Sequence, residues 1–237
     1  MRKLMMIAAF GVTALVANPP AMAADQPAPA PAAQTLTGVP IDAAWKRKLY
    51  DFAREKLKHP AWGWSHSERD YRTASEIAAK ESLAIDTDVL FAAAFTHDIG
   101  AIGDFQREGV DHAVRSAELA EPLLRESGFP MAKWPAVRDA ILGHMHDKPA
   151  GSRPEAIVLH DADTLDFLGA VGVARRLSVT GTAPDYAGGT ARIRDFAEKL
   201  PARLVTATAK RMAVSRVAEM RGFLAQLDSE TVNGRLP

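Results

Sequence analysis

Apolar residues recur at helical intervals from about Val39 to the C-terminal region of this 237-residue chain. No strict alternation of apolar and polar residues extends beyond a few positions, so the pattern does not favour strands. The segments expected to be helical are 41–57, 65–83, 89–99, 111–127, a short helix beginning near Pro135, 152–177, 190–200 and 202–227. We therefore expect an all-α fold, a single helical bundle with one core.

Local signals predict where several of these helices begin and end. The expected N-terminal caps are Asp86 and Asp111. Gly100 is expected to end a helix in the left-handed conformation, and Gly128 with Pro130 is expected to end another. Two spacings typical of capping boxes join Ser65 to Glu68 and Ser152 to Glu155. Pro201 is expected to separate the last two helices.

The composition is that of an ordinary globular protein. Lys and Arg number 29, Asp and Glu also number 29, 47% of the residues are hydrophobic and there is no cysteine. These values exclude collagen-like, disordered and disulfide-stapled chains. Because the charges balance, no overall field attracts a nucleic-acid duplex, and we expect no such partner. Walker, G-x-S-x-G and dinucleotide-binding motifs are absent from the sequence, which argues against nucleotide-driven motors, serine hydrolases and Rossmann dehydrogenases.

The N-terminal region has the pattern of a secretory signal peptide. Arg2 and Lys3 precede an apolar run of 13 residues, and a small-residue cleavage site ends at Ala23. The apolar run is shorter than the roughly 20 residues that a membrane-spanning helix needs, so we expect no membrane anchor. Residues 1–23 are thus a predicted signal peptide, 24–38 a disordered Ala/Pro-rich tether and 39–237 the folded domain. A periplasmic or secreted protein is expected.

Histidine and aspartate side chains lie on helix faces that the core should use. His97 shares a face with Leu90 and Ala93, and Asp98 follows it directly. Asp163 lies inside an otherwise apolar segment. A buried carboxylate is costly unless a cation satisfies it, and no Lys or Arg lies within one helical turn before Asp98. Inward-facing imidazoles and carboxylates on separate helices are typical of a divalent metal site in a bundle core.

Each of these residues also has a simpler interpretation. A single inward histidine is more often a hydrogen-bonded core residue than a metal ligand, and a single aspartate near a helix start is usually a cap. The joint occurrence of acids and histidines on several predicted faces is what favours the metal.

Several motifs resemble the HD-domain superfamily of metal-dependent phosphohydrolases, particularly its small stand-alone bacterial members. The motifs are an H-x-x-R opening at His66–Arg69, an H-D-I-G doublet at 97–100, D-A-D-T-L-D at 161–166 and the stretch 169–175 that follows. The resemblance covers about residues 45–228 and implies a single HD domain with a metal site in its core. An isolated His-Asp pair is uninformative, whereas the pair with H-x-x-R before it and D-A-D-x-L-D after it is specific.

The resemblance implies roles for particular residues. The implied metal ligands are His66, His97, Asp98 and Asp163. Asp163 is preferred to Asp161 because it matches the family's A-D-x-x-D position; Asp161 is expected to orient a ligand histidine. Two further histidines, His112 and His144, are expected either to hold a second metal bridged by Asp98 or to bind substrate, and we favour one metal with substrate-binding histidines. Asp98 and Arg69 are the implied catalytic residues, and Arg175 is expected to bind the substrate.

Two positions depart from the family's pattern. Asp70 stands where an apolar residue usually follows H-x-x-R, and Ala101 stands where a basic residue often follows H-D-I-G. The second departure leaves open which group neutralises a phosphate.

The implied activity is hydrolysis of a phosphoester or phosphoanhydride in a small phosphorylated, nucleotide-like substrate. The cofactor is a divalent metal ion, with Mn, Mg, Ni, Co and Fe all open. One alternative is a di-iron oxygenase of the HD type, which uses all six positions His66, His97, Asp98, His112, His144 and Asp163. The other is an exported metal-binding bundle without catalysis. The sequence does not predict an oligomeric state.

Overall fold

The computed structural model describes residues 33–181 and 187–232, so the predicted signal peptide and most of the predicted tether lie outside the described residues. Within this part of the chain the secondary structure is helical, and the expected all-α fold is confirmed. The α-helices are α1 (Ala44–Lys56), α2 (Trp64–Lys80), α3 (Thr87–Ala94), α4 (His112–Ser127), α5 (Trp134–Leu142), α6 (Pro154–Asp166), α7 (Gly169–Ser178), α8 (Ala187–Lys199) and α9 (Ala207–Glu230). Short 3₁₀ turns at Ile99–Ala101, Gly103–Phe105, Met131–Lys133 and Leu200–Arg203 connect some of them.

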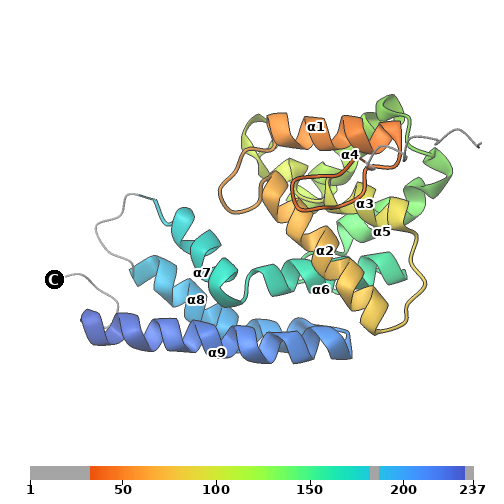
Figure 1. Ribbon diagram of the computed structural model, residues 1–237. Helices are drawn as coiled ribbons and strands as arrows, with labels where there is room; N and C mark the ends of the chain where they lie inside the picture. Colours follow the sequence, from red (N-terminus) through yellow and green to blue (C-terminus); the bar gives the residue numbers. More distant parts are fainter. Residues whose placement is uncertain (1–32, 182–186, 233–237) are drawn as a thin grey trace, which may run out of the picture. The chain divides into compact units, whose positions relative to one another are not determined.

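Helix α6 lies at the centre of the helical packing. It contacts α2, α3, α5, α7 and α9, and it runs between α2 and α9 in Figure 1. A helix with neighbours on nearly every side needs side chains that tolerate burial all round. Almost every residue of α6 is buried, and these residues include three aspartates, Asp161, Asp163 and Asp166. The positions of these acids decide how the site is built.

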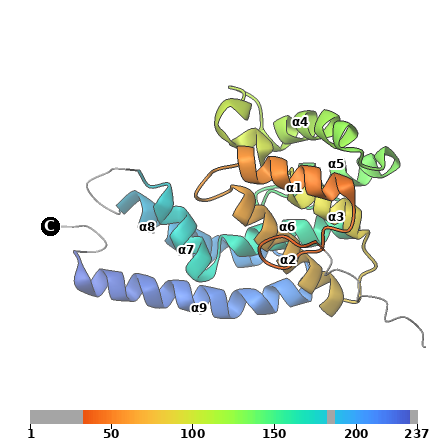
Figure 2. The ribbon, with the colours of Figure 1, turned by 45° about the horizontal axis from the view of Figure 1, so that its top comes forward.

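The segment expected to be one helix over 152–177 is two helices, α6 and α7. The chain turns at Gly169, whose φ of 75° is left-handed, a conformation that a residue with a Cβ adopts only at a cost. Figure 2 shows α7 leaving the end of α6 toward α8. The prediction missed the break because the apolar pattern continues through it.

Helix α3 ends earlier than expected. It stops at Ala94, and residues 95–98 form turns before the 3₁₀ segment Ile99–Ala101. The prediction that Gly100 is a left-handed helix end is wrong; it lies within that segment against α4. A Cβ on Gly100 would come within 2.6 Å of the carbonyl oxygen of His112, so glycine permits this close approach.

The single-residue caps are confirmed. The Asp86 side chain accepts from the backbone N–H groups of Asp88 and Val89, and Asp111 accepts from those of Ala113 and Val114. Gly128 is left-handed, with φ of 92°, as expected of a residue that ends a helix.

Neither predicted capping box forms. Helix α2 is preceded by Gly63, and Glu68 instead accepts hydrogen bonds from the backbone N–H and hydroxyl of Thr37. Glu155 accepts from the backbone N–H of Asp86, far away in the sequence. Both glutamates accept hydrogen bonds from residues far away in the sequence, and local spacing does not predict such contacts.

The contact with Thr37 also corrects the expected boundary of the tether. Residues 33–38 have a defined structure, with Gln34 bridged to Pro40 and Thr35 buried. They pack against α2 because Glu68 offers an acceptor for Thr37.

Among the described residues, every helix is too short or too polar to span a bilayer.

Asp161 does not have the partners expected of it. Its two carboxylate oxygens accept from the backbone N–H groups of Val205 and Thr206, at 2.7 and 2.8 Å, just before α9 begins. The carboxylate therefore anchors the start of α9, and the expectation that it orients a ligand histidine is wrong.

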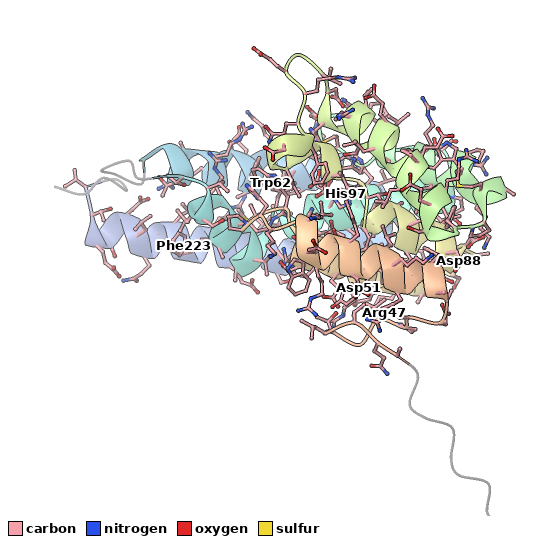
Figure 3. All side chains as sticks on the ribbon, turned by 90° about the horizontal axis from the view of Figure 1, so that it is seen from above. Arg47, Asp51, Trp62, Asp88, His97 and Phe223 are labelled. Atoms are coloured by element: carbon pink, nitrogen blue, oxygen red, sulfur yellow. The ribbon has the colours of Figure 1, made fainter. Side chains whose placement is uncertain are left out.

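Asp161→Asn tests this anchoring role. An amide has only one acceptor oxygen, so one buried N–H before α9 loses its partner. We expect the free energy of unfolding to fall by about 1–3 kcal/mol, measured by urea denaturation. The control is Asp51→Asn, because Asp51 is exposed on α1 (Figure 3). Unchanged stability would contradict the assignment.

Candidate metal centre

Four buried side chains converge in the core between α2, the end of α3 and α6. They are His66, Asp70, His97 and Asp163. His66 and Asp70 are four residues apart on α2 and therefore lie on the same face of that helix. Asp163 projects from α6, which packs against α2. The bundle thus brings together three donors that the resemblance implies and one, Asp70, that it does not.

The donor atoms of this cluster lie close enough to share one ion. Nε2 of His66 is 3.2 Å from Nε2 of His97, 3.1 Å from Oδ2 of Asp70 and 3.2 Å from Oδ1 of Asp163. All four donor atoms lie within 4.8 Å of one another.

The hydrogen bonds of His66 and His97 leave Nε2 as the nitrogen that faces the cluster. Nδ1 of His66 is 2.8 Å from a carboxylate oxygen of Asp166, and Nδ1 of His97 is 2.9 Å from the carbonyl oxygen of Ala94. An ionised carboxylate and a carbonyl only accept, so each Nδ1 carries the proton and donates it. In the neutral rings Nε2 then has a lone pair, and the two lone pairs face each other.

The carboxylates of the cluster lack hydrogen-bond donors. Both oxygens of Asp70 and Oδ1 of Asp163 are buried with no hydrogen-bond partner among the described residues. Although His66 Nε2 is within ion-pairing distance of both, in the neutral ring that nitrogen has no proton to give when Nδ1 is the donor. Unsatisfied buried carboxylates beside imidazole lone pairs are the donor set that a divalent cation satisfies, so these residues fit the metal that the sequence predicts.

The electrostatics show how strongly these groups act on one another when no ion lies between them. Burial and Arg175 lower the pKa of His66, but Asp70, Asp163 and Asp166 outweigh them and raise it well above its usual range, so a metal competes with a proton for Nε2. Burial raises the pKa of Asp70 well above its usual range, and the nearby carboxylates of Asp166 and Asp163 raise it further although His66 opposes them. Burial also lowers the pKa of His97 to about 4, so its ring is neutral at pH 7 and able to coordinate.

Asp98 lies between this cluster and two further histidines. Its Oδ2 is 3.5 Å from Nε2 of both His66 and His97, while its Oδ1 is 3.5 Å from Nε2 of His112 and 3.4 Å from Nε2 of His144. One carboxylate therefore faces two donor sets, one through each oxygen. His97, Asp98 and His144 form a second group that could hold an ion.

The two further histidines come from separate elements. His112 opens α4 directly after its cap, and His144 follows α5. Their Nε2 atoms are 3.4 Å apart, and Nδ1 of His144 lies 2.6 Å from the carbonyl oxygen of Ile141. His144 thus has the same orientation as the histidines of the first cluster, with Nε2 directed inward.

The centre is most open near His112. The His112 side chain is 29% exposed and Asp98 12%, whereas His66, His97 and His144 are at most 1% exposed. His112 also lines a cavity of about 420 Å³ together with Trp62. The Trp62 ring stacks on His59 at 4.0 Å, and its indole N–H donates to the carbonyl oxygen of Ala101. Figure 3 marks Trp62 and His97 in this region.

Asp166 fixes His66 from the side opposite Nε2. Its Oδ2 accepts from His66 Nδ1, Arg69 Nη2 and Arg175 Nη1, each at 2.8 Å, and its Oδ1 accepts from Arg69 Nε at 2.9 Å. Although burial raises the pKa of Asp166, these partners hold it well below the usual range. The carboxylate therefore stays ionised and sets the tautomer of His66.

The two arginines expected at the substrate are both committed to Asp166. Arg175 is buried, donates through Nε to the carbonyl oxygen of Ala61 and lies over the ring of Phe167; its Nη2 still reaches within 3.4 Å of His66 Nε2. Arg69 donates hydrogen bonds through Nε and Nη2 to Asp166, and it does not line the cavity beside His112. Of the two, Arg175 borders the centre.

Sequence reasoning thus missed two residues of the centre. Asp70 was noted only as a departure from the family's pattern, although its spacing of four from His66 on one helix places both on one face. Asp166 stands three residues after Asp163 and was quoted within a motif without a role. The six residues implied as donors for one or two metals, His66, His97, Asp98, His112, His144 and Asp163, are brought together.

Removing Asp70 should weaken metal binding. Asp70→Ala removes two carboxylate oxygens that have no hydrogen-bond partner in the cluster. We expect metal affinity to fall by at least about ten-fold, a loss that substitutions at metal sites commonly cause. Elemental analysis after dialysis against a chelator series measures it. Glu76→Gln, an exposed change on the same helix, is the control. Full metal content in Asp70→Ala would contradict this arrangement.

Comparisons with known proteins identify relatives of this chain. The HD domain family matches residues 63–168. A crystal structure described as a predicted HD superfamily hydrolase, from an uncultured Thermotogales bacterium, is 30% identical with a TM-score of 0.54 and covers 78% of this chain and 91% of its own. Bacillus subtilis YpgQ, solved in complex with ADP, is 23% identical with a TM-score of 0.59 and covers 78% of this chain and 97% of its own. An uncharacterized protein of Clostridium beijerinckii is 26% identical over 123 residues, 52% of this chain and 74% of that protein.

Proposed function

This chain belongs to the HD superfamily, and from that premise we propose that it is a metal-dependent phosphohydrolase. Its relationship to HD superfamily hydrolases and its buried His/Asp cluster support a metal-dependent hydrolase in general. The strongest support for the finer proposal is the position of Asp98, whose two oxygens face two separate donor sets. A carboxylate shared in this way suits a pair of ions that act on one phosphoryl group.

The residues divide into two groups that would hold the ions. His66, Asp70, His97 and Asp163 would hold one, and His112 with His144 would hold the other, with Asp98 shared. Divalent ions in such a centre supply a nucleophilic water at neutral pH, by lowering its pKa toward about 7, and polarise the phosphoryl oxygen. This arrangement favours two metals over the single metal preferred from the sequence.

Asp98 is suited to hold cations and to orient the attacking water. Burial raises its pKa, but His97, His144 and His66 outweigh that effect and hold the pKa well below the usual range. The carboxylate is therefore ionised at neutral pH and accepts a hydrogen bond from water. Arg175, beside His66, is placed to offset negative charge on a bound phosphoryl group. Arg69 instead acts through Asp166 on the orientation of His66.

A small nucleotide-like substrate fits the surroundings of the centre. The cavity beside His112 is about 420 Å³, within the range of small-molecule sites, and Trp62 offers an aromatic surface. YpgQ was solved in complex with ADP, which supports a nucleotide-like ligand for this chain. The predicted signal peptide at residues 1–23 supports a periplasmic or secreted enzyme that acts on extracellular phosphoesters.

An oxygenase with two irons is the second candidate. The observation that favours it is the convergence of all six donor residues, since the oxygenases of this scaffold use the same positions. Metal content distinguishes the two enzymes. Two irons per chain with O₂ consumption would support the oxygenase, whereas phosphoester hydrolysis dependent on Mn, Mg, Ni or Co supports the hydrolase. Firm metal binding without either activity would support a non-catalytic bundle.

The activity is tested with a panel of phosphoesters and pyrophosphates under several divalent ions, manganese first. We expect hydrolysis by the wild-type protein and a loss of at least about 100-fold in His97→Ala and in Asp98→Ala, because each change removes a donor at the shared carboxylate or beside it. Circular dichroism checks that both variants remain folded. Asp51→Asn should retain full activity, and full activity in either active-site variant would overturn the proposal.

The number of ions is tested by His144→Ala. This change removes a donor from the second group while leaving the four residues of the first group intact. We expect the metal content to fall from two ions per chain to one, measured by elemental analysis after gel filtration. A wild-type protein that holds a single ion at saturating metal would contradict the two-metal arrangement.

A further inference from the structure

A second cavity lies on the Nδ1 side of His66, away from the metal donors. Its volume is about 510 Å³, and it lies between α2, the segment 37–40 and α9. None of the metal-donor residues lines it, but Arg69 and Asp166 do. This cavity is therefore separate from the one beside His112 and is connected to the centre through the residues that orient His66.

Three arginines line the cavity, and two of them, Arg72 and Arg216, have no carboxylate partner among the described residues. Arg72 is exposed and has no hydrogen bond or ion pair among the described residues. Arg69 retains a free Nη1 after binding Asp166, and Arg216, from α9, donates through Nη1 to the carbonyl oxygen of Leu165. Their spare N–H groups remain available to a ligand.

The acids that line the cavity are already paired. Glu76 is bound by Lys80, and Asp166 is bound by Arg69, Arg175 and the imidazole of His66. They leave little negative charge to compete with an incoming anion.

The chemistry of the cavity selects a phosphate group. The planar guanidinium fork matches the oxygens of a phosphate, and arginines at positions 69 and 72 lie on one face of α2, three residues apart. The volume is within the range of about 300–1,000 Å³ typical of small-molecule sites. We propose that this arginine cavity binds the phosphate group of a small phosphorylated molecule, as a site distinct from the catalytic centre and coupled to it.

The coupling passes through two contacts. An anion that engages Arg69 draws its guanidinium from Asp166, and Asp166 then becomes a stronger acceptor for the Nδ1–H of His66. A stronger acceptor at Nδ1 makes Nε2 a better metal donor, and the added negative charge also favours a nearby cation. Binding of phosphate in the cavity therefore tightens metal binding, and by reciprocity metal tightens binding of phosphate.

Site-resolved chemical modification tests the binding. The metal-loaded wild-type protein is treated with phenylglyoxal, with and without inorganic phosphate, and modification of each arginine is quantified by peptide mass spectrometry. We expect phosphate to slow modification of Arg72 by at least about five-fold and to leave Arg138, an exposed arginine on α5, unchanged. Equal rates at Arg72 with and without phosphate would overturn the site. Because the readout is local, it is independent of whether any phosphoester is hydrolysed.

Metal affinity tests the coupling. A chromogenic chelator measures the metal dissociation constant with and without inorganic phosphate in the wild type, in Arg72→Ala/Arg216→Ala and in Arg138→Ala. Phosphate that binds at the catalytic ions contributes equally to all three proteins. The quantity compared is the metal dissociation constant without phosphate divided by the constant with phosphate. We expect this ratio to be at least about five-fold larger in the wild type and in Arg138→Ala than in the double variant. An equal factor in all three, with melting curves showing a folded double variant, would overturn the coupling.

Discussion

The electrostatics of the core are set by buried carboxylates that face imidazole lone pairs. Asp70, Asp98 and Asp163 lie among histidines, and the Nδ1 protons of His66, His97 and His144 are directed away from them, to a carboxylate or to backbone carbonyls. Burial raises the pKa of Asp70, and although burial lowers the pKa of His66, the carboxylates around that ring raise it well above the usual range, so without an ion the cluster would hold protons between its donors. A divalent cation in that space satisfies the same lone pairs. The surrounding helices hold the donor atoms close together although these atoms repel one another. A bound cation would attract each of them and offset that repulsion.

The three aspartates of helix α6 contact three different parts of the molecule. Asp161 holds the start of α9, Asp163 faces the donor cluster and Asp166 gathers two arginines and His66. Successive side chains on a helix point about 100° apart, so acids at these spacings reach different neighbours. One buried helix thereby links the C-terminal part of the fold, the metal donors and the residues that orient them.

The fold class and most donors were predictable because their signals are local or belong to ordered motifs. Helical periodicity gave the all-α fold, and single-residue caps such as Asp111 depend only on the next few residues. Two of the errors concern contacts made over long distances in the sequence: Glu68 binds Thr37, and Asp161 binds the backbone before α9. A short polar side chain has the same local signature in either role, so spacing could not distinguish them. Asp70 was missed because the family's pattern was given more weight than its position on the face of His66.

The early end of α3 has a consequence for how neighbouring residues can cooperate. Had that helix continued past Ala94, His97 and Asp98 would diverge by a full step of the helical wheel, and only one of them would reach the centre. The irregular backbone lets two consecutive residues serve the same ions. Substitutions that favour regular helix at residues 95–98 would therefore order the backbone locally but separate His97 from Asp98. Weak helix formers at these positions preserve the site.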